Sequence, residues 1–144
     1  MAITSAVCNS FKQEILEAEH NFTASTGNTF NLALYDSDAS LGAGTTAYSS
    51  SEEITNTSGT AYSAKGKALT SVTPTLDSST AVCDFADVSW TSASFTANGC
   101  LIFNDSHSTD ASVCAIDLVE IKQLQAELLQ FNFQQHQLQQ QLSE

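Results

Sequence analysis

Short apolar runs in which hydrophobic residues recur at every second position fill the middle of this 144-residue chain, from position 28 to position 117. In the first run, at 28–35, Phe30, Leu32 and Leu34 fall on one face of an extended chain. Further runs cover 68–72, 81–85, 88–96, 100–104 and 112–117, with a weaker one at 45–54. Pro74 is expected to end the run at 68–72. Runs of period two that return about every ten residues predict a mainly β fold, an antiparallel β-sandwich of immunoglobulin-like type.

A helical pattern lies near the beginning of the chain. Phe11 and Ile15 fall on one face of a helix, and Asn9 or Ser10 can cap its start with a side-chain oxygen. We therefore expect a short amphipathic helix at 9–19 that packs against the strands.

The charge of the chain disfavours several classes of partner. The net charge is −12, from 16 acidic residues and 4 lysines, with no arginine. Nucleic acids and anionic membranes are bound by clustered cations. The sequence has no run of about 20 apolar residues that could span a membrane, and its first residues lack the basic and apolar regions of a signal peptide. We therefore expect no nucleic-acid partner, no membrane partner and no signal peptide. The length of the strand-rich part fits one domain, which we place at residues 1–117.

The cysteines are spread along the chain without a CxxC pair: Cys8, Cys83, Cys100 and Cys114. Three of them lie inside apolar strand-like runs, where a thiol packs as a small hydrophobic group. The sequence favours free thiols in the core. A single disulfide is the alternative, and a metal site is the least favoured interpretation.

From position 118 the composition changes to a glutamine-rich tail that extends to position 144. The apolar residues of this tail are mostly three or four positions apart, which is the spacing of a heptad seam. The residues of this seam are Ile121, Leu124, Leu128, Phe131, Leu138 and Leu142, and Gln135 fills the missing position. Taken at face value, the segment 118–144 is a Gln-rich amphipathic helix that can pair with another helix.

A second interpretation explains the change of composition itself. Every glutamine or histidine codon begins with CA, so a base missing from the gene near Leu118 would turn intended Ser, Thr, Ala or Pro codons into these residues. With one T restored after Asp117, the tail can read D-F-G-G-D-K-T-A-T-G-R-T-F-T-I-Q-F, followed by a closing apolar strand. We favour a frameshift, because composition, periodicity and turn chemistry all improve together in the restored frame.

Six sequence segments occur in the following order before position 118: AITSAVCNSFKQEIL, NTFNLALY, LGAGTTAY, GTAYSAKGKALT, AVCDFADVSW and GCLIFND. In this order they resemble a family of small virion structural proteins of tailed bacteriophages that is common in marine phage genomes. The resemblance extends from Met1 to about Asp117. Members of that family end in a D-F-G-G-D-K segment, two strands and an A-I-I-R-I terminus, so the chain departs from them at Leu118 and the restored frame returns to them.

The resemblance implies a non-enzymatic structural or decoration protein that acts through subunit contacts. Its expected partners are other virion proteins or further copies of itself. Its expected location is the virion, assembled in the host cytoplasm.

The sequence offers weak candidates for chemistry. Asp36 and Asp38 open like a calcium loop, but the glycine and the glutamate of that motif are missing, so a turn is favoured. Asp84 and Asp87 are interpreted as turn residues rather than as a catalytic carboxylate pair. We therefore expect no catalytic residue, no cofactor and no metal, and hence no enzyme.

Three aromatic residues are candidates for a contact surface. Tyr48 and Tyr62 flank glycine-containing turns, which usually lie at the surface. Trp90 alternates with Val88 and is either a core residue, which we favour, or an exposed contact for a neighbouring subunit. An exposed aromatic residue beside Asp or Asn would favour the alternative function, a receptor- or carbohydrate-binding module of a phage tail or fibre.

Overall fold

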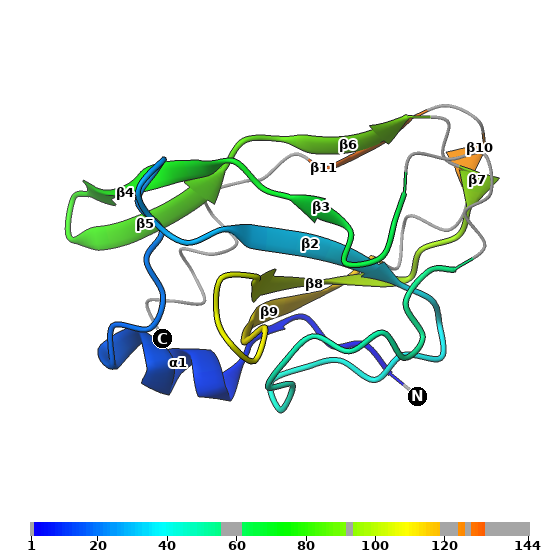
Figure 1. Cartoon of the computed structure of the whole chain (residues 1–144), viewed down its shortest axis with the longest axis horizontal. Helices are drawn as coiled ribbons and strands as arrows, with labels where there is room; N and C mark the ends of the chain where they lie inside the picture. Colours follow the sequence, from blue (N-terminus) through cyan, green and yellow to red (C-terminus); the bar gives the residue numbers. More distant parts are fainter. Residues whose placement is uncertain (1, 56–61, 92–93, 119–123, 126–127, 132–144) are drawn as a thin grey trace.

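The computed structural model describes residues 2–55, 62–91, 94–118, 124–125 and 128–131 (Figure 1). Its named strands pair antiparallel, which confirms a mainly β fold with antiparallel sheets. The largest sheet has the strand order β1-β9-β8-β2-β3. These strands are β1 (Ala6–Val7), β2 (Phe30–Tyr35), β3 (Lys67–Ala68), β8 (Gly99–Asn104) and β9 (Ser112–Asp117).

Strand β2, which lies between β8 and β3, is largely buried on both of its faces. Phe30, Leu32 and Leu34 belong to the larger hydrophobic core, as their alternation predicts. Ala33 and Tyr35 belong to a smaller core on the opposite face. Consecutive residues of a strand point to opposite faces, so the sheet is covered on both sides rather than half-buried.

A second layer of strands covers one face of this sheet (Figure 1). It contains β4 (Ser71–Asp77), β5 (Thr80–Phe85), β6 (Val88–Thr91) and β7 (Ser94–Phe95). Phe85, Trp90 and Phe95 from this layer share the larger core with the buried residues of β2 and β8. Two layers of antiparallel strands around a common core are consistent with a β-sandwich.

Strand β4 differs from the expectation at Pro74. The strand continues through the proline, and its pairing with β5 shifts register between Val72 and Thr75. Among the described residues β4 pairs with β5 alone, so it lies at a sheet edge. Proline cannot donate to a ladder of hydrogen bonds, and an irregular edge strand tolerates that loss.

The segment between β2 and β3 covers the other face of the main sheet. Ala39 is buried there with Phe103, and Leu41 and Tyr48 pack beside them. The weak strand expected at 45–54 is not formed, since this part of the segment makes isolated bridges only. Its serine-rich sequence holds few large apolar side chains that would fix a register.

Helix α1 (Asn9–Leu16) is shorter than expected, and Cys8 rather than Asn9 or Ser10 occupies its N-cap position. The helix ends because Ala18 adopts a positive φ of 63°. The N–H of Glu19 then donates to the carbonyl of Glu14 at 3.0 Å, and the N–H of Ala18 donates to that of Ile15 at 3.3 Å. These two bonds form a Schellman motif, which here uses alanine where glycine is usual.

The described residues of the tail beyond Leu118 form strands. Strand β10 (Leu124–Gln125) pairs with β7, and β11 (Leu128–Phe131) pairs with β6. At these positions the structure differs from the helix that the heptad spacing predicts. A helix satisfies its own backbone groups, whereas a strand also satisfies those of the neighbouring edges β6 and β7. Leu118 is buried, and residues 119–123, 126–127 and 132–144 lie outside the described residues.

All four cysteines are buried as free thiols, which confirms the prediction of core packing. Burial raises the pKa of each thiol, and it raises the pKa of Cys83 to about 12. A thiol with a raised pKa reacts slowly because the thiolate is the nucleophile.

Candidate functional site

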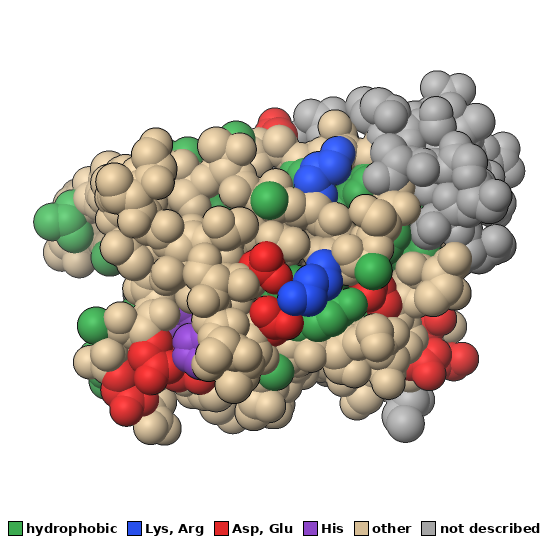
Figure 2. Space-filling view, viewed as in Figure 1, with side chains coloured by type: hydrophobic (Ala, Val, Ile, Leu, Met, Phe, Trp, Pro, Cys, Tyr) green, Lys and Arg blue, Asp and Glu red, His purple; other side chains and the backbone are tan. Residues whose placement is uncertain are grey.

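The described residues offer three features that could carry function: a surface around Lys65, a cluster of histidines and glutamates, and an apolar cavity. The Lys65 surface contains Tyr48, a residue predicted to make contacts. The Lys65 Nζ lies 5.7 Å from the ring centroid of Tyr48 and 6.0 Å from that of Phe103. The same Nζ forms ion pairs with Asp105 at 3.0 Å and Asp110 at 2.8 Å. Near the middle of the face in Figure 2, a basic side chain lies between acidic ones and beside hydrophobic ones.

Glu53 lies buried beneath this surface with three hydrogen-bond donors. The Tyr48 hydroxyl donates to Glu53 Oε1 at 2.5 Å, and the Tyr62 hydroxyl donates to Oε2 at 2.6 Å. The backbone N–H of Lys65 donates to the same Oε2 at 2.8 Å, and Lys65 has a positive φ of 69°. A buried carboxylate requires such donors, so Glu53 fixes the segment between β2 and β3 in place.

The two tyrosines of this network hold their protons tightly. Burial, and next the hydrogen bond to Glu53, raises the pKa of Tyr62 far above its usual range. The same two causes, in the same order, raise the pKa of Tyr48 to about 12. Both hydroxyl groups therefore serve as donors to the carboxylate at neutral pH, which is a structural role.

Of the three predicted contact residues, the structure leaves only Tyr48 partly accessible. Tyr62 is 5% exposed and Trp90 is 0% exposed, so neither side chain contacts a neighbouring molecule in this conformation. Trp90 is a core residue, as favoured, because its strand turns alternate residues into the sandwich. Tyr62 was predicted at the surface because of its place beside a turn, but its hydroxyl reaches inward to Glu53.

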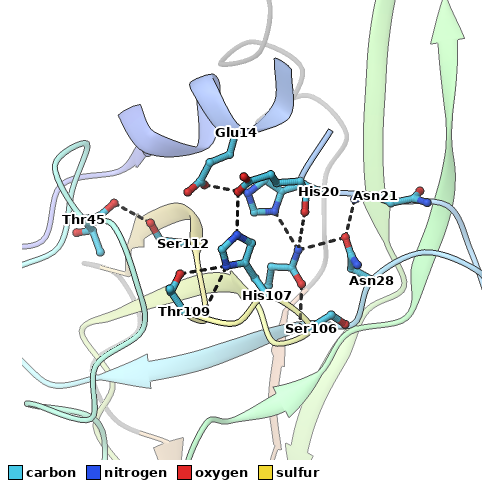
Figure 3. A network of polar contacts seen from close by, with 11 residues as sticks. Glu14, His20, Asn21, Asn28, Thr45, Ser106, His107, Thr109 and Ser112 are labelled. Carbon is cyan, nitrogen blue, oxygen red and sulfur yellow. Dashed lines mark hydrogen bonds and ion pairs between the residues drawn. The ribbon is translucent and has the colours of Figure 1, made fainter. Parts of the chain in front are cut away.

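Two histidine–glutamate pairs lie side by side where the end of α1 meets the loop between β8 and β9 (Figure 3). His20 Nε2 lies 3.0 Å from Glu14 Oε1, and His107 Nε2 lies 2.8 Å from Glu19 Oε2. The two imidazole rings stack with centroids 6.0 Å apart and planes inclined by 20°. The Schellman motif brings Glu14 and Glu19 together, and the loop supplies His107.

Asn104 fixes the orientation of the His20 ring through a contact between its side-chain amide and His20 Nδ1. It is fully buried, and its Nδ2 lies 3.1 Å from His20 Nδ1 and donates to Asn28 Oδ1 at 3.2 Å. Its Oδ1 accepts the N–H of Ser106 at 3.0 Å. These partners settle which end of the amide carries the protons. His20 Nδ1 is therefore an acceptor, and His20 Nε2 carries the proton that it donates to Glu14.

Asp36 and Asp84, two of the aspartates considered from the sequence, accept hydrogen bonds from nearby backbone N–H groups. Asp36 Oδ1 accepts the N–H of Asp38 at 2.9 Å, which is the side-chain turn expected. Carboxylate oxygens of Asp36, Asp38 and Glu52 lie within 4.8 Å of one another, although exposed carboxylates commonly gather without a ligand. Asp84 lies within β5 rather than in the turn predicted for it, and its Oδ1 accepts the N–H of Phe85 at 2.8 Å.

The third feature is an apolar cavity of about 180 Å³ between α1, the hairpin β4–β5 and the main sheet. Its walls include Phe11 and Ile15 of α1, Phe22, and Pro74 and Val82 of the hairpin, and every other lining residue is also apolar. Sequence alternation indicated that these residues face a core, but it gave no sign that the helix and the hairpin would leave a space between them.

Large apolar side chains are exposed on the two elements that border this cavity. Leu16 is 87% exposed and Ile15 37% exposed at the end of α1. Leu76 is 73% exposed and Val72 44% exposed on β4. Figure 2 shows hydrophobic side chains at the left-hand end of the molecule, where the hairpin and the helix lie in Figure 1. We call these four residues and the cavity the apolar end.

Comparison of the chain with protein-family models, with curated proteins and with solved structures finds no match. Within the part of the chain that the structure describes, no helix has the length and apolar character needed to cross a membrane.

Proposed function

We propose that this chain is a non-enzymatic structural or decoration protein of a bacteriophage particle. It acts through contacts with other virion proteins or with further copies of itself, and it is located in the virion. The resemblance of residues 1–117 to small virion proteins supports this function. We also propose the finer description of the fold, an immunoglobulin-like sandwich.

The observation that carries the proposal is the apolar end. Leu16 and Leu76 are largely exposed beside an open apolar cavity, and β4 presents an edge there. Contiguous exposed apolar surface usually marks a contact site, and an edge strand can pair with another chain. The charge of −12 keeps such a surface in solution and repels packaged nucleic acid.

The apolar end can be tested by the association of the purified chain in solution. We expect sedimentation velocity to show association that increases with concentration, and the double substitution L16S/L76S to weaken it at least tenfold. T75S is the matched control, because Thr75 is an exposed residue of the same strand and the change leaves the apolar side chains in place. A double variant that associates as strongly as the unchanged chain would show that this end is not the contact surface.

The alternative function, a receptor- or carbohydrate-binding module, has less support. Sugar binding uses an exposed aromatic face. Trp90 and Tyr62 are buried, which leaves Tyr48 next to Asp105 and Asp110 through their shared partner Lys65. Binding to a glycan array that is lost in Y48A would favour this alternative.

We further propose that the tail from Leu118 is read out of frame. The strand T-F-T-I-Q-F of the restored frame begins at the position of Leu128, where the structure has β11. In the observed register, the restored frame pairs a phenylalanine with Trp90 and an isoleucine with Val88. It also pairs threonines with Thr91 and Ser89, so its alternation follows that of β6. Sequencing the source DNA across the codons for residues 116–122 tests this, because an extra T is expected and an intact frame would refute it.

A further inference from the structure

We infer that Glu14, Glu19 and His107 form a binding site for a divalent transition-metal ion such as Zn²⁺. One ligand atom from each side chain lies within 4.8 Å of the other two. An ion at their centre is then about 2.8 Å or less from each atom, and zinc bonds to oxygen and nitrogen are about 2.0–2.2 Å long. Each side chain therefore needs to move by less than about 1 Å to bind the ion.

The mixture of ligand types selects the class of metal. Two carboxylates and one imidazole suit zinc and the neighbouring first-row transition metals. Calcium and magnesium take oxygen ligands and gain little from the imidazole of His107. Three protein ligands leave positions for water, so the site would be open rather than closed.

His20 is a positioning residue for this site rather than a ligand. Its Nδ1 accepts from the buried Asn104 amide, so its Nε2 carries a proton and donates to Glu14 Oε1 at 3.0 Å. A nitrogen that carries a proton cannot bind a metal. The His20 side chain is fully buried, and it holds the Glu14 carboxylate in place much as outer partners hold ligands in known metal sites.

Thr109 allows His107 to become a ligand. In the present structure His107 Nδ1 accepts the N–H of Thr109 at 3.2 Å, and the Thr109 Oγ1 lies 3.0 Å from the same nitrogen. Metal binding at Nε2 requires the imidazole proton to transfer from Nε2 to Nδ1. The Thr109 hydroxyl can then accept that proton in a hydrogen bond, because a hydroxyl is both donor and acceptor, whereas the Thr109 N–H loses His107 Nδ1 as its acceptor.

The proposed ion would connect two segments that are far apart in the sequence. Glu14 lies in the last turn of α1, Glu19 follows the end of that helix, and His107 lies in the loop between β8 and β9. The Schellman bond between Glu19 and Glu14 and the turn bond from the His107 N–H to the Asn104 carbonyl fix both segments before an ion arrives. A metal that binds the folded chain more tightly than the unfolded chain stabilises it.

The test is isothermal titration of the metal-free full chain with Zn²⁺ near neutral pH, with Ca²⁺ as the second probe. We expect saturable binding of one Zn²⁺ per chain, a rise in melting temperature with zinc, and little binding of Ca²⁺. H107A and E19Q should each weaken Zn²⁺ binding at least tenfold. E17Q is the matched control, because Glu17 is an exposed carboxylate between Glu14 and Glu19 in the sequence and its replacement should leave the affinity unchanged.

Three results would overturn the proposal: no saturable Zn²⁺ binding up to about 1 mM, equal affinity in H107A and E19Q, or equal affinity for Ca²⁺. The positioning role of His20 has its own test. H20L should lower the Zn²⁺ affinity about tenfold, and H20Q should restore most of it because an amide N–H can donate to Glu14. An H20L protein that binds Zn²⁺ as tightly as the unchanged chain would assign His20 to the core alone.

Discussion

Removal of the Tyr62 hydroxyl group is expected to lower stability strongly, because its one oxygen atom forms hydrogen bonds with two buried groups. It donates to Glu53 Oε2 at 2.6 Å and accepts the N–H of Leu34 at 3.0 Å. The substitution Y62F removes this oxygen and keeps the ring, which packs 5.7 Å from Trp90 and 5.8 Å from Phe95 between centroids. The change therefore isolates the polar contribution of the residue.

The expected loss of stability follows from the two contacts. A hydrogen bond to a charged group contributes about 1.5–3 kcal/mol, and a buried N–H left without a partner costs about 1–3 kcal/mol. The Leu34 N–H lies in strand β2, whose buried position gives water little access. Since the two costs are not independent, we expect Y62F to lower the free energy of unfolding by about 3 kcal/mol.

Urea denaturation of Y62F and Y48F, followed by circular dichroism, measures this difference. Y48F removes another hydroxyl from the same carboxylate, but Tyr48 is only partly buried, so we expect a loss of about 1 kcal/mol. A loss of stability in Y62F no larger than that in Y48F would show that burial of the hydrogen bond does not determine its contribution.

Three further predictions concern pH, thiols and a turn. Burial and the hydrogen bond to Glu53 raise the pKa of Tyr62. Its contribution to stability is therefore complete below about pH 10 and is lost as the pH rises further. Urea titrations at alkaline pH should show this loss of stability, and the loss should be smaller in Y62F. The buried thiols, with the pKa of Cys83 raised to about 12, should not react with Ellman's reagent at mildly alkaline pH until urea unfolds the chain, and fast labelling of the folded chain would contradict their burial. A Cβ on Gly66, whose φ is +69°, would lie 1.9 Å from the Leu32 carbonyl oxygen, so G66A should cost about 3 kcal/mol or more. G44A, with no atom within 4 Å of the added Cβ, should change stability by about 0.5 kcal/mol or less, and equal urea midpoints for the two variants would refute this contrast.

Local alternation was sufficient to predict the bounds of three strands of the core. The runs at 81–85, 100–104 and 112–117 became β5, β8 and β9 with bounds within a residue of those expected. Their large side chains face a core on at least one side, so the pattern of burial and the pattern of sequence agree.

Features that depend on contacts between distant segments could not be predicted in this way. Ala18 gave no signal of a positive φ, because glycine is the usual residue at that position of a Schellman motif. Glu53 lies in a serine-rich segment that has no periodic pattern. Its hydrogen bond with Tyr62 depends on the tertiary fold, which places the Tyr62 hydroxyl against β2. The sequence predicted no metal site because the positions of Glu19 and His107 are 88 residues apart.

The heptad spacing of the tail was overridden where β10 and β11 complete the edges of β7 and β6. Pairing with exposed backbone groups outweighs the helical preference of a short segment, because a strand edge leaves donors and acceptors that a helix cannot reach.

The most direct test of the proposed virion role is mass spectrometry of gradient-purified phage particles from the source of this gene. We expect peptides from residues 1–117 in the particles, in amounts comparable to those of other structural proteins, together with peptides that show which reading frame follows Asp117. Peptides found in infected cells but missing from the purified particles would contradict a structural role in the virion.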